Sequence, residues 1–272
     1  MKIVFTDLDG TLLDPQTYAW EAARPALEEL KSRGVPCVPV TSKTRAEVEY
    51  WRRALSIGGP FIVENGGAAY VPEGWFPFRI PGAASRDGYE VLEWGTPYPL
   101  LAAALDESAQ SAGCDVEGFH HMDARAVSQI CGIPLEQAVL ARQREYDEPF
   151  CILDPALARR LLAELEGRGL HWTEGGRFHH VLGANDKAVA VQAVARWFSR
   201  LHDQVTTVGL GDAPNDAGFL EAVDIPVVVR SRASSALLDR LPHAWLTAHA
   251  GPRGWNDAIL ALLRAGDARR ST

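Results

Sequence analysis

The stretch that decides the fold is Ile3-Val4-Phe5-Thr6-Asp7-Leu8-Asp9-Gly10-Thr11. Its apolar beginning has no polar alternation, which is typical of a strand buried in a parallel sheet, and Gly10-Thr11 marks the turn that ends it. Residues at the carboxyl end of such a strand line the crevice where α/β proteins bind ligands. The pattern therefore predicts that Asp7 and Asp9 lie in a ligand-binding crevice.

The spacing of these two carboxylates suits phosphoryl transfer. A carboxylate is ionised at neutral pH, so Asp7 can attack phosphorus and form an aspartyl-phosphate without a separate base. Asp9, two residues on, can protonate the leaving group and later deprotonate water. The structural alternative is that both residues only cap a turn, as Asp often does.

Three further segments argue against that alternative. The apolar strand 35–40 ends in Thr41-Ser42, Lys187 begins a helix-like run to residue 197, and strand-like residues 205–211 end in Asp212, followed by Asp216. With the first segment, they resemble, in order, the four motifs of the haloacid dehalogenase superfamily of phosphatases. The resemblance implies that the Thr41 hydroxyl binds a phosphoryl oxygen and that the Lys187 ammonium offsets negative charge.

The expected cofactor is Mg²⁺. The candidate ligands are oxygen atoms, with no Cys or His at matching spacing, and such donors favour Mg²⁺ over zinc or copper. By resemblance, the carboxylates of Asp7 and Asp212 and the backbone carbonyl of Asp9 bind the ion, while Asp216 acts through water or by orienting Lys187. Metal dependence is expected because so many carboxylates would otherwise repel a phosphate.

Composition limits the class of protein. The 272 residues are 47% hydrophobic and carry a net charge of −8, which allows a large core and argues against a nucleic-acid partner. No apolar run reaches the roughly 18 residues of a membrane span, and no signal peptide precedes the first strand. The four cysteines form no CxxC pair and are expected to be reduced. We expect a cytoplasmic enzyme with a small-molecule substrate, and the oligomeric state stays open.

The chain organisation predicts an α/β fold: a Rossmann-like core of parallel strands flanked by helices, with an inserted α+β cap domain. We expect the core at residues 1–80 and 185–272 and the cap at 81–184, where Pro, Gly and aromatic residues are dense. An insert between the second and third motifs resembles the large C2-type α/β cap of the superfamily, which closes over the substrate. The expected elements are helices at 20–31, 44–55, 99–112, 134–144 and 155–168, strands at 61–63 and 150–153, and a hairpin of 170–173 with 177–182.

Four further segments resemble one particular family within this superfamily. Arg142-Gln143-Arg144-Glu145-Tyr146-Asp147-Glu148-Pro149 and Gly175-Gly176-Arg177-Phe178 resemble segments of mannosyl-3-phosphoglycerate phosphatases, as do Thr41-Ser42-Lys43-Thr44-Arg45 and Glu64-Asn65-Gly66-Gly67. This resemblance implies hydrolysis of mannosyl-3-phosphoglycerate to mannosylglycerate, a compatible solute, and phosphate. GGRF alone is a weak signal.

Such a substrate carries a phosphate, a carboxylate and a sugar ring. Lys43 and Arg45 can meet the carboxylate, Arg144 or Arg177 can reach it from the cap, and Glu64 and Asn65 can bind hydroxyl groups. The full set of candidate substrate contacts is Ser42, Lys43, Thr44, Arg45, Glu64, Asn65, Gly66, Arg144 and Arg177.

Several alternatives stay open. The substrate is alternatively glucosyl-3-phosphoglycerate, sucrose phosphate or another sugar phosphate; a phosphomutase shares the core motifs, and a non-catalytic sugar-phosphate sensor is the alternative of another class. His120-His121 with Asp123, and the pair His179-His180, invite a zinc interpretation. No ligand set at known spacing surrounds them, so we expect them to be structural or solvent-facing.

Overall fold

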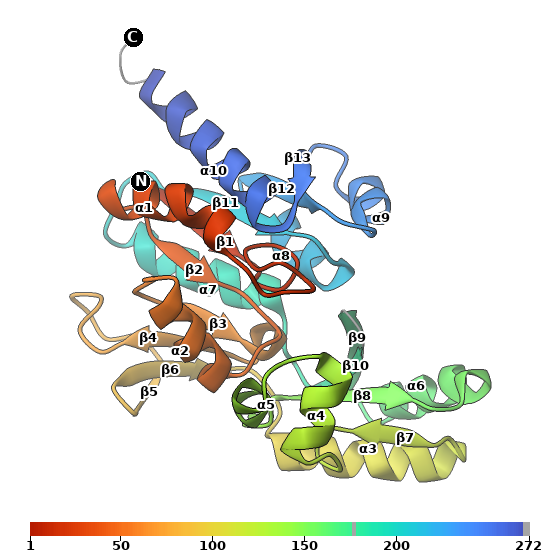
Figure 1. Cartoon of the computed structure of the whole chain (residues 1–272). Coiled ribbons are helices and arrows are strands. Elements are labelled where there is room, and N and C mark those ends of the chain that lie inside the picture. The colour runs from red at the N-terminus through yellow and green to blue at the C-terminus, as the bar shows by residue number, and fades with distance from the viewer. Residues whose placement is uncertain (176–177, 269–272) are drawn as a thin grey trace.

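The centre of the fold is a five-stranded parallel sheet, seen in a computed structural model that describes residues 1–175 and 178–268 (Figure 1). Its strand order is β13-β12-β11-β1-β2. The bounds are β1 Lys2–Thr6, β2 Cys37–Pro39, β11 Thr206–Gly211, β12 Ile225–Arg230 and β13 Trp245–Ala250. Because β1 lies between β2 and β11, the segments that follow these three strands meet at one edge.

Helices cover both faces of this sheet, which explains why β1 is apolar without alternation. Val4 belongs to the buried cluster that contains Leu27 of α1 and Trp255 of α10, whereas Ile3 and Phe5 belong to the cluster that contains residues of α7, α8 and α9. The flanking helices are α1 Arg24–Ser32, α2 Arg45–Ala54, α7 Lys187–Ser199, α8 Ala217–Glu221, α9 Ser234–Arg240 and α10 Gly251–Ala268. Short 3₁₀ turns span Glu21–Ala23, Glu64–Gly66, Pro155–Leu157 and Pro214–Asp216.

A second, antiparallel sheet extends the core beside β2. Its order is β3-β4-β6-β5, with β3 Phe61–Val63, β4 Ala68–Pro72, β5 Ala84–Arg86 and β6 Tyr89–Glu93. A parallel bridge between Val40 and Ile62 joins it to the first sheet. Strand β6 pairs with β4, and β5 pairs with β6. We therefore propose that the insert begins at about residue 96 instead of residue 81.

We propose that residues 96–184 form the cap. They contain a four-stranded antiparallel sheet, β7-β8-β10-β9, with α3 and α6 packed together over Phe150 and Val181 (Figure 1). The bounds are α3 Tyr98–Ala112, β7 Val116–Gly118, α4 Ala124–Cys131, α5 Leu135–Ala141, β8 Asp147–Ile152, α6 Ala158–Gly167, β9 His171–Gly175 and β10 Phe178–Leu182. The buried cluster around Leu101, Phe150 and Val181 gives the proposed cap an apolar core of its own, as a separate domain needs.

Two elements of the cap differ from the sequence-based expectation. The helix expected at 134–144 ends at Ala141. The chain leaves the helix there, and Arg144 lies beside the buried Asp147 carboxylate. Helix α4 was not expected, although Asp123 caps its first turn and Gly132 ends it in the left-handed conformation. These are ordinary helix start and stop signals, so α4 was predictable.

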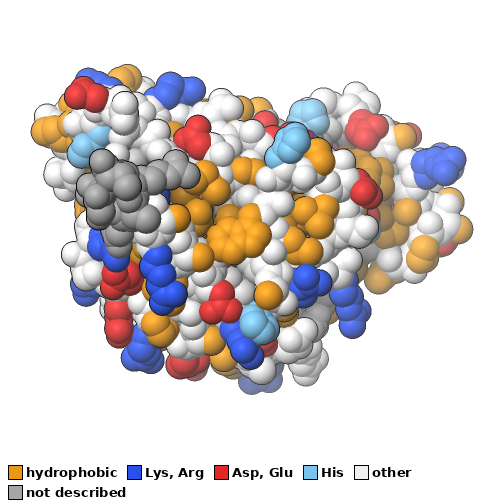
Figure 2. Space-filling model, turned by 90° about the horizontal axis from the view of Figure 1, so that it is seen from above, with side chains coloured by type: hydrophobic (Ala, Val, Ile, Leu, Met, Phe, Trp, Pro, Cys, Tyr) orange, Lys and Arg blue, Asp and Glu red, His pale blue; other side chains and the backbone are white. Residues whose placement is uncertain are grey.

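Two observations concern the surface of the molecule and the character of its helices. Figure 2 shows one face of the molecule, on which apolar side chains gather centrally and basic side chains are interspersed with acidic ones. Within residues 1–175 and 178–268, no helix has both the length and the apolar character needed to cross a bilayer.

Candidate active site

The two aspartates of the first motif lie directly beyond β1. The Asp7 amide donates to the Leu210 carbonyl at 2.9 Å, so strand pairing continues one residue past β1 and fixes the Asp7 backbone. The Asp7 side chain is buried. Asp9 pairs through Oδ2 with Lys43 at 3.0 Å, whereas its Oδ1 is buried without a hydrogen-bond partner. An unpartnered carboxylate oxygen is available to a substrate atom.

The fourth motif meets the first across Gly10. Thr11 Oγ1 donates to Asp212 Oδ1 at 2.9 Å, which holds Asp212 beside the β1 turn. Gly10 has a φ of 81°, and a Cβ added there would lie 2.5 Å from Asp212 Oδ2. Only glycine both adopts this conformation readily and leaves room for the carboxylate.

Gly10→Ala should therefore displace Asp212. We expect the Mg²⁺ concentration for half-maximal activity to rise about tenfold or more, as for other losses of ligand orientation. The matched control is Gly74→Ala, because Gly74 has a φ of +74° but nothing within 4 Å of an added Cβ. Metal titration of activity compares the two. Equal metal requirements in both variants would contradict a role for this close approach.

Lys187 joins the third motif to the first and fourth. Asp186 caps α7, its Oδ1 accepting from the Ala188 amide at 2.7 Å, which places Lys187 at the first helical position. The buried ammonium lies 3.3 Å from Asp7 Oδ1 and 2.7 Å from Asp216 Oδ1. Although burial alone would lower it, these carboxylates raise the pKa of Lys187 above its usual value. Lys187 is therefore a fixed positive charge beside Asp7.

Asp216 acts as a supporting residue in this arrangement. Its Oδ1 accepts from Lys187, and its Oδ2 accepts from the amides of Asp212 at 3.0 Å and Ala213 at 3.1 Å. Both oxygens are thus engaged by the protein. This fits the expectation that Asp216 orients Lys187 better than a role as a direct metal ligand.

The electrostatics of the site fit a divalent cation. Carboxylate oxygens of Asp7, Asp212 and Asp216 lie within 4.8 Å of one another. Burial and then the Asp216 charge raise the pKa of Asp7, and burial and Asp216 raise the pKa of Asp212 to about 7. The all-oxygen donor set suits Mg²⁺, whose charge would favour the ionised form that a nucleophile needs.

The second motif supplies buried polar groups beside β2. Thr41 is fully buried, and its Oγ1 accepts from the Lys43 amide at 3.2 Å. Lys43 is also buried, with its ammonium 3.3 Å from Glu47 and 4.9 Å from the centre of the Tyr18 ring. Asp9 and Glu47 raise the pKa of Lys43 even though burial opposes this, so Lys43 stays charged.

Sequence reasoning missed Glu47 and Tyr18 and assigned Thr44 to the substrate. In the structure Thr44 caps α2: its hydroxyl accepts from the Glu47 amide at 3.1 Å, and Glu47 Oε2 accepts from the Thr44 amide at 3.0 Å. The segment Thr44-Arg45-Ala46-Glu47 is a capping-box signature, so the capping role of Thr44 was predictable from the sequence. The packing of Tyr18 beside Lys43 has no comparable local signal.

The residues expected to contact sugar or glycerate instead join the core to the cap. Glu64 accepts from the backbone amides of Glu145 and Tyr146, the latter at 2.7 Å, and Asn65 Nδ2 donates to Asp147 Oδ2 at 2.6 Å. Both lie in a turn with positive φ and are buried. Burial raises the pKa of Glu64 to about 8 although Arg144 opposes it.

Arg144 is the centre of this joint. Its guanidinium lies 2.9 Å from Asp147 Oδ1 and 3.7 Å from Glu64 Oε2, and it donates to the Ser42 carbonyl at 3.0 Å. The side chain is only 3% exposed. Arg144 is thus engaged by protein groups on both sides of the joint, which fits a structural role better than the expected contact with substrate.

The remaining candidates divide as follows. Arg45 pairs with Asp87 at 2.8 Å and Glu145 at 3.7 Å. Gly66 allows close backbone packing, since an added Cβ would lie 2.4 Å from the Asp186 carbonyl. Ser42 is partly buried. Arg177 lies outside the described residues.

The site combines a buried Asp7 at a strand end with the Lys187 ammonium and the carboxylates of Asp212 and Asp216. This combination is typical of phosphoryl-transfer hydrolases of the haloacid dehalogenase type. A family model described as haloacid dehalogenase-like hydrolase matches residues 4–77. The chain is 40% identical, over 96% of its length and 97% of the relative's, to a glucosyl-3-phosphoglycerate/mannosyl-3-phosphoglycerate phosphatase of Methanococcoides burtonii. The protein belongs to this family of phosphoric monoester hydrolases.

Two further comparisons agree. A mannosyl-3-phosphoglycerate phosphatase of Pyrococcus furiosus is 36% identical, over 84% of this chain and 91% of its own. A solved phosphatase of the same superfamily from Bacteroides thetaiotaomicron has a TM-score of 0.66 at 18% identity, covering 98% of this chain and 95% of that chain. This structural similarity confirms the predicted fold class, a parallel α/β core with an inserted cap.

Proposed function

We propose that this enzyme removes phosphate from a glycosyl-3-phosphoglycerate, with the mannosyl form as the first candidate and the glucosyl form as the second. The product would be the glycosylglycerate, a compatible solute. The observation that carries the proposal is the buried Asp7 carboxylate held by Lys187 beside Asp212 and Asp216. The substrate class is supported by the names of relatives that are 36–40% identical.

In the proposed reaction Asp7 attacks phosphorus in line and forms an aspartyl-phosphate. Asp9 protonates the departing glycerate oxygen and then deprotonates the water that hydrolyses the intermediate. Burial raises the pKa of Asp9, with Lys43 opposing, and a raised pKa favours the protonated acid that the first step needs. Lys187 and the Thr41 hydroxyl stabilise charge on the phosphoryl group.

Haloacid dehalogenase phosphatases generally use Mg²⁺. We propose that the carboxylates of Asp7 and Asp212 and the backbone carbonyl of Asp9 hold the ion in this chain. When bound, it offsets charge on the phosphoryl group and lets a dianionic substrate approach the carboxylates. Asp216 completes the site indirectly, by holding Lys187 and the Asp212 amide.

For recognition of the glycerate carboxylate we propose Lys43. Its ammonium lies 3.0 Å from the proposed general acid, so it is beside the leaving group. Ser42, which precedes it, stays a candidate contact, and Arg177 of the cap stays a prediction. Arg144, Glu64 and Asn65 are assigned to the joint between core and cap rather than to the substrate.

We also propose that the enzyme works in the cytoplasm. Cys37 and Cys114 are buried and form no disulfide bond. Burial raises the pKa of Cys37 to about 12, so it stays a thiol at neutral pH. Reduced cysteines are usual in the cytosol, where glutathione and thioredoxin maintain them.

Phosphate release from a substrate panel tests the function. We expect kcat/KM for one glycosyl-3-phosphoglycerate to exceed that for sucrose phosphate, mannose-6-phosphate and 3-phosphoglycerate by about 10²-fold or more, because the cap recognises several groups at once. A chelator should abolish the activity, and excess Mg²⁺ should restore it.

Other outcomes would each contradict one part of the proposal. Equal activity on all substrates would keep the chemistry and exclude the substrate class. Isomerisation of a sugar phosphate without phosphate release would identify a mutase. Tight ligand binding with zero turnover across the panel would identify a sensor.

A further inference from the structure

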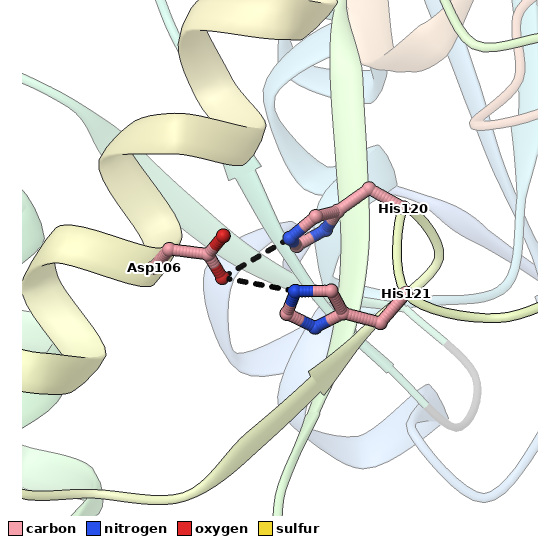
Figure 3. A group of neighbouring side chains, drawn as sticks. All are labelled: Asp106, His120 and His121. Atoms are coloured by element: carbon pink, nitrogen blue, oxygen red, sulfur yellow. Dashed lines mark hydrogen bonds and ion pairs between the residues drawn. The ribbon is translucent and has the colours of Figure 1, made fainter.

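A second cluster of potential metal ligands lies in the cap, on elements that the proposed reaction does not use. Asp106 projects from the middle of α3 toward His120 and His121, which follow β7 (Figure 3). The Asp106 Oδ1 atom lies 3.1 Å from His120 Nε2 and 3.5 Å from His121 Nε2. The two imidazole rings lie with their centres 3.8 Å apart. Three donor atoms from two separate segments thus converge.

The hydrogen bonds around His120 orient one nitrogen toward this point. His120 Nδ1 lies 2.7 Å from the buried carboxylate of Glu148 on β8, and Glu148 also accepts from the His120 amide at 3.2 Å. An imidazole that binds a metal almost always donates its other ring N–H to a carboxylate or carbonyl. With Nδ1 donating to Glu148, the Nε2 lone pair faces Asp106.

These contacts require a positive charge between His120 Nε2 and Asp106 Oδ1. A neutral imidazole carries one ring proton, yet both ring nitrogens of His120 face carboxylate oxygens, at 2.7 Å and 3.1 Å. A nitrogen lone pair facing an oxygen lone pair is repulsive unless a proton or a metal ion lies between them. His121 Nε2 approaches the same oxygen of Asp106, so one cation there would satisfy three donors.

The geometry points to a site for a divalent transition-metal ion, Zn²⁺ in the first instance, bound by Asp106, His120 and His121. Tetrahedral bonds of about 2.0–2.1 Å place neighbouring ligands roughly 3.3–3.5 Å apart, and the two nitrogen–oxygen distances of 3.1 and 3.5 Å bracket that spacing. Asp106 and His121 have side-chain exposures of 47% and 50%, so the fourth position opens to solvent. Glu148 is the residue that positions His120.

This site differs chemically from the catalytic one. Two imidazoles and one carboxylate favour zinc or a neighbouring transition metal, whereas the carboxylates around Asp7 favour Mg²⁺. The sequence analysis set aside a zinc site of His120 and His121 with Asp123 for lack of a ligand set, and Asp123 indeed caps α4 by accepting from the Ala126 amide at 2.8 Å. The third donor comes from α3 instead. A bound ion would cross-link α3 to the loop that precedes α4.

Zn²⁺ binding to the whole protein, measured by calorimetry in excess Mg²⁺, tests the site. We expect one equivalent to bind to the wild type, and Asp106→Asn and His121→Asn to weaken that binding at least tenfold. His249→Asn is the matched control, because His249 forms an exposed pair with Asp257 at 3.1 Å and should leave Zn²⁺ binding unchanged. Co²⁺ in place of Zn²⁺ should give a visible absorption spectrum of a tetrahedral ion, and both cluster variants should lose it.

Three results would overturn the inference. The first is the absence of Zn²⁺ binding to the wild type at micromolar concentrations. The second is wild-type affinity in both cluster variants while their circular dichroism confirms folding. The third is loss of the Zn²⁺ signal in Asp212→Asn but not in Asp106→Asn, which would place the ion at the catalytic carboxylates. None of these results depends on phosphatase turnover, so failure here is distinguishable from failure of the proposed function.

Discussion

Asp7→Asn should lower kcat by about 10⁴-fold or more while leaving the protein folded. The amide is isosteric with the carboxylate, but it cannot attack phosphorus, and loss of a nucleophile removes the covalent route entirely. Steady-state phosphate release with saturating substrate and Mg²⁺ measures the effect. Asp203→Asn, at an exposed position, is the control and should keep wild-type activity.

The same variant should be at least as stable as the wild type without metal. Burial and Asp216 raise the pKa of Asp7, so the ionised carboxylate opposes folding above its unfolded pKa. An uncharged amide removes that repulsion, and Lys187 keeps Asp216 as its partner at 2.7 Å. Activity above about one percent of wild type in Asp7→Asn, with deamidation excluded by mass spectrometry, would show that another residue is the nucleophile.

Arg144→Met should destabilise the protein by about 3–5 kcal/mol, because it leaves the ionised, buried Asp147 carboxylate without the guanidinium that compensates its charge. Asp147 and Glu64 have fully buried side chains at 2.9 and 3.7 Å from the guanidinium. Urea unfolding at pH 7 measures the loss. Arg142→Met is the control, since Arg142 is exposed two residues away and should change stability by less than about 0.5 kcal/mol.

The stability deficit of Arg144→Met should also depend on pH. In the wild type Arg144 and His180 hold the pKa of Asp147 below its usual value despite burial, so Asp147 stays ionised from pH 5 to pH 8. Without Arg144, burial raises that pKa in the folded state above its unfolded value. Stability is then lost as pH rises, so the deficit should be larger at pH 8 than at pH 5.

These measurements also separate a structural role for Arg144 from the expected contact with substrate. A structural role predicts lower stability, with KM for the surviving folded enzyme changed little. A contact with substrate predicts raised KM at wild-type stability. The buried guanidinium and its bond to the Ser42 carbonyl favour the first result.

The fold class and the carboxylates that meet in the candidate active site were predictable from the amino-acid sequence alone. Asp7, Lys187 and Asp212 are far apart in the chain, yet each follows a strand or begins a helix whose type is readable from local pattern. In a parallel sheet the carboxyl ends of neighbouring strands meet at one edge. Knowing where each strand ends was therefore enough to predict which carboxylates converge.

The partners of the remaining polar residues could be identified only from the folded structure. Arg144 lies on the cap and contacts Glu64, which is 80 residues earlier in the core, and Asp106 on α3 reaches His120 in the turn after β7. No local periodicity encodes such pairs, because they depend on how the cap packs on the core and on how α3 packs on its sheet. The sequence motif around Arg144 marked an important segment, and the fold assigned that segment to the joint between core and cap.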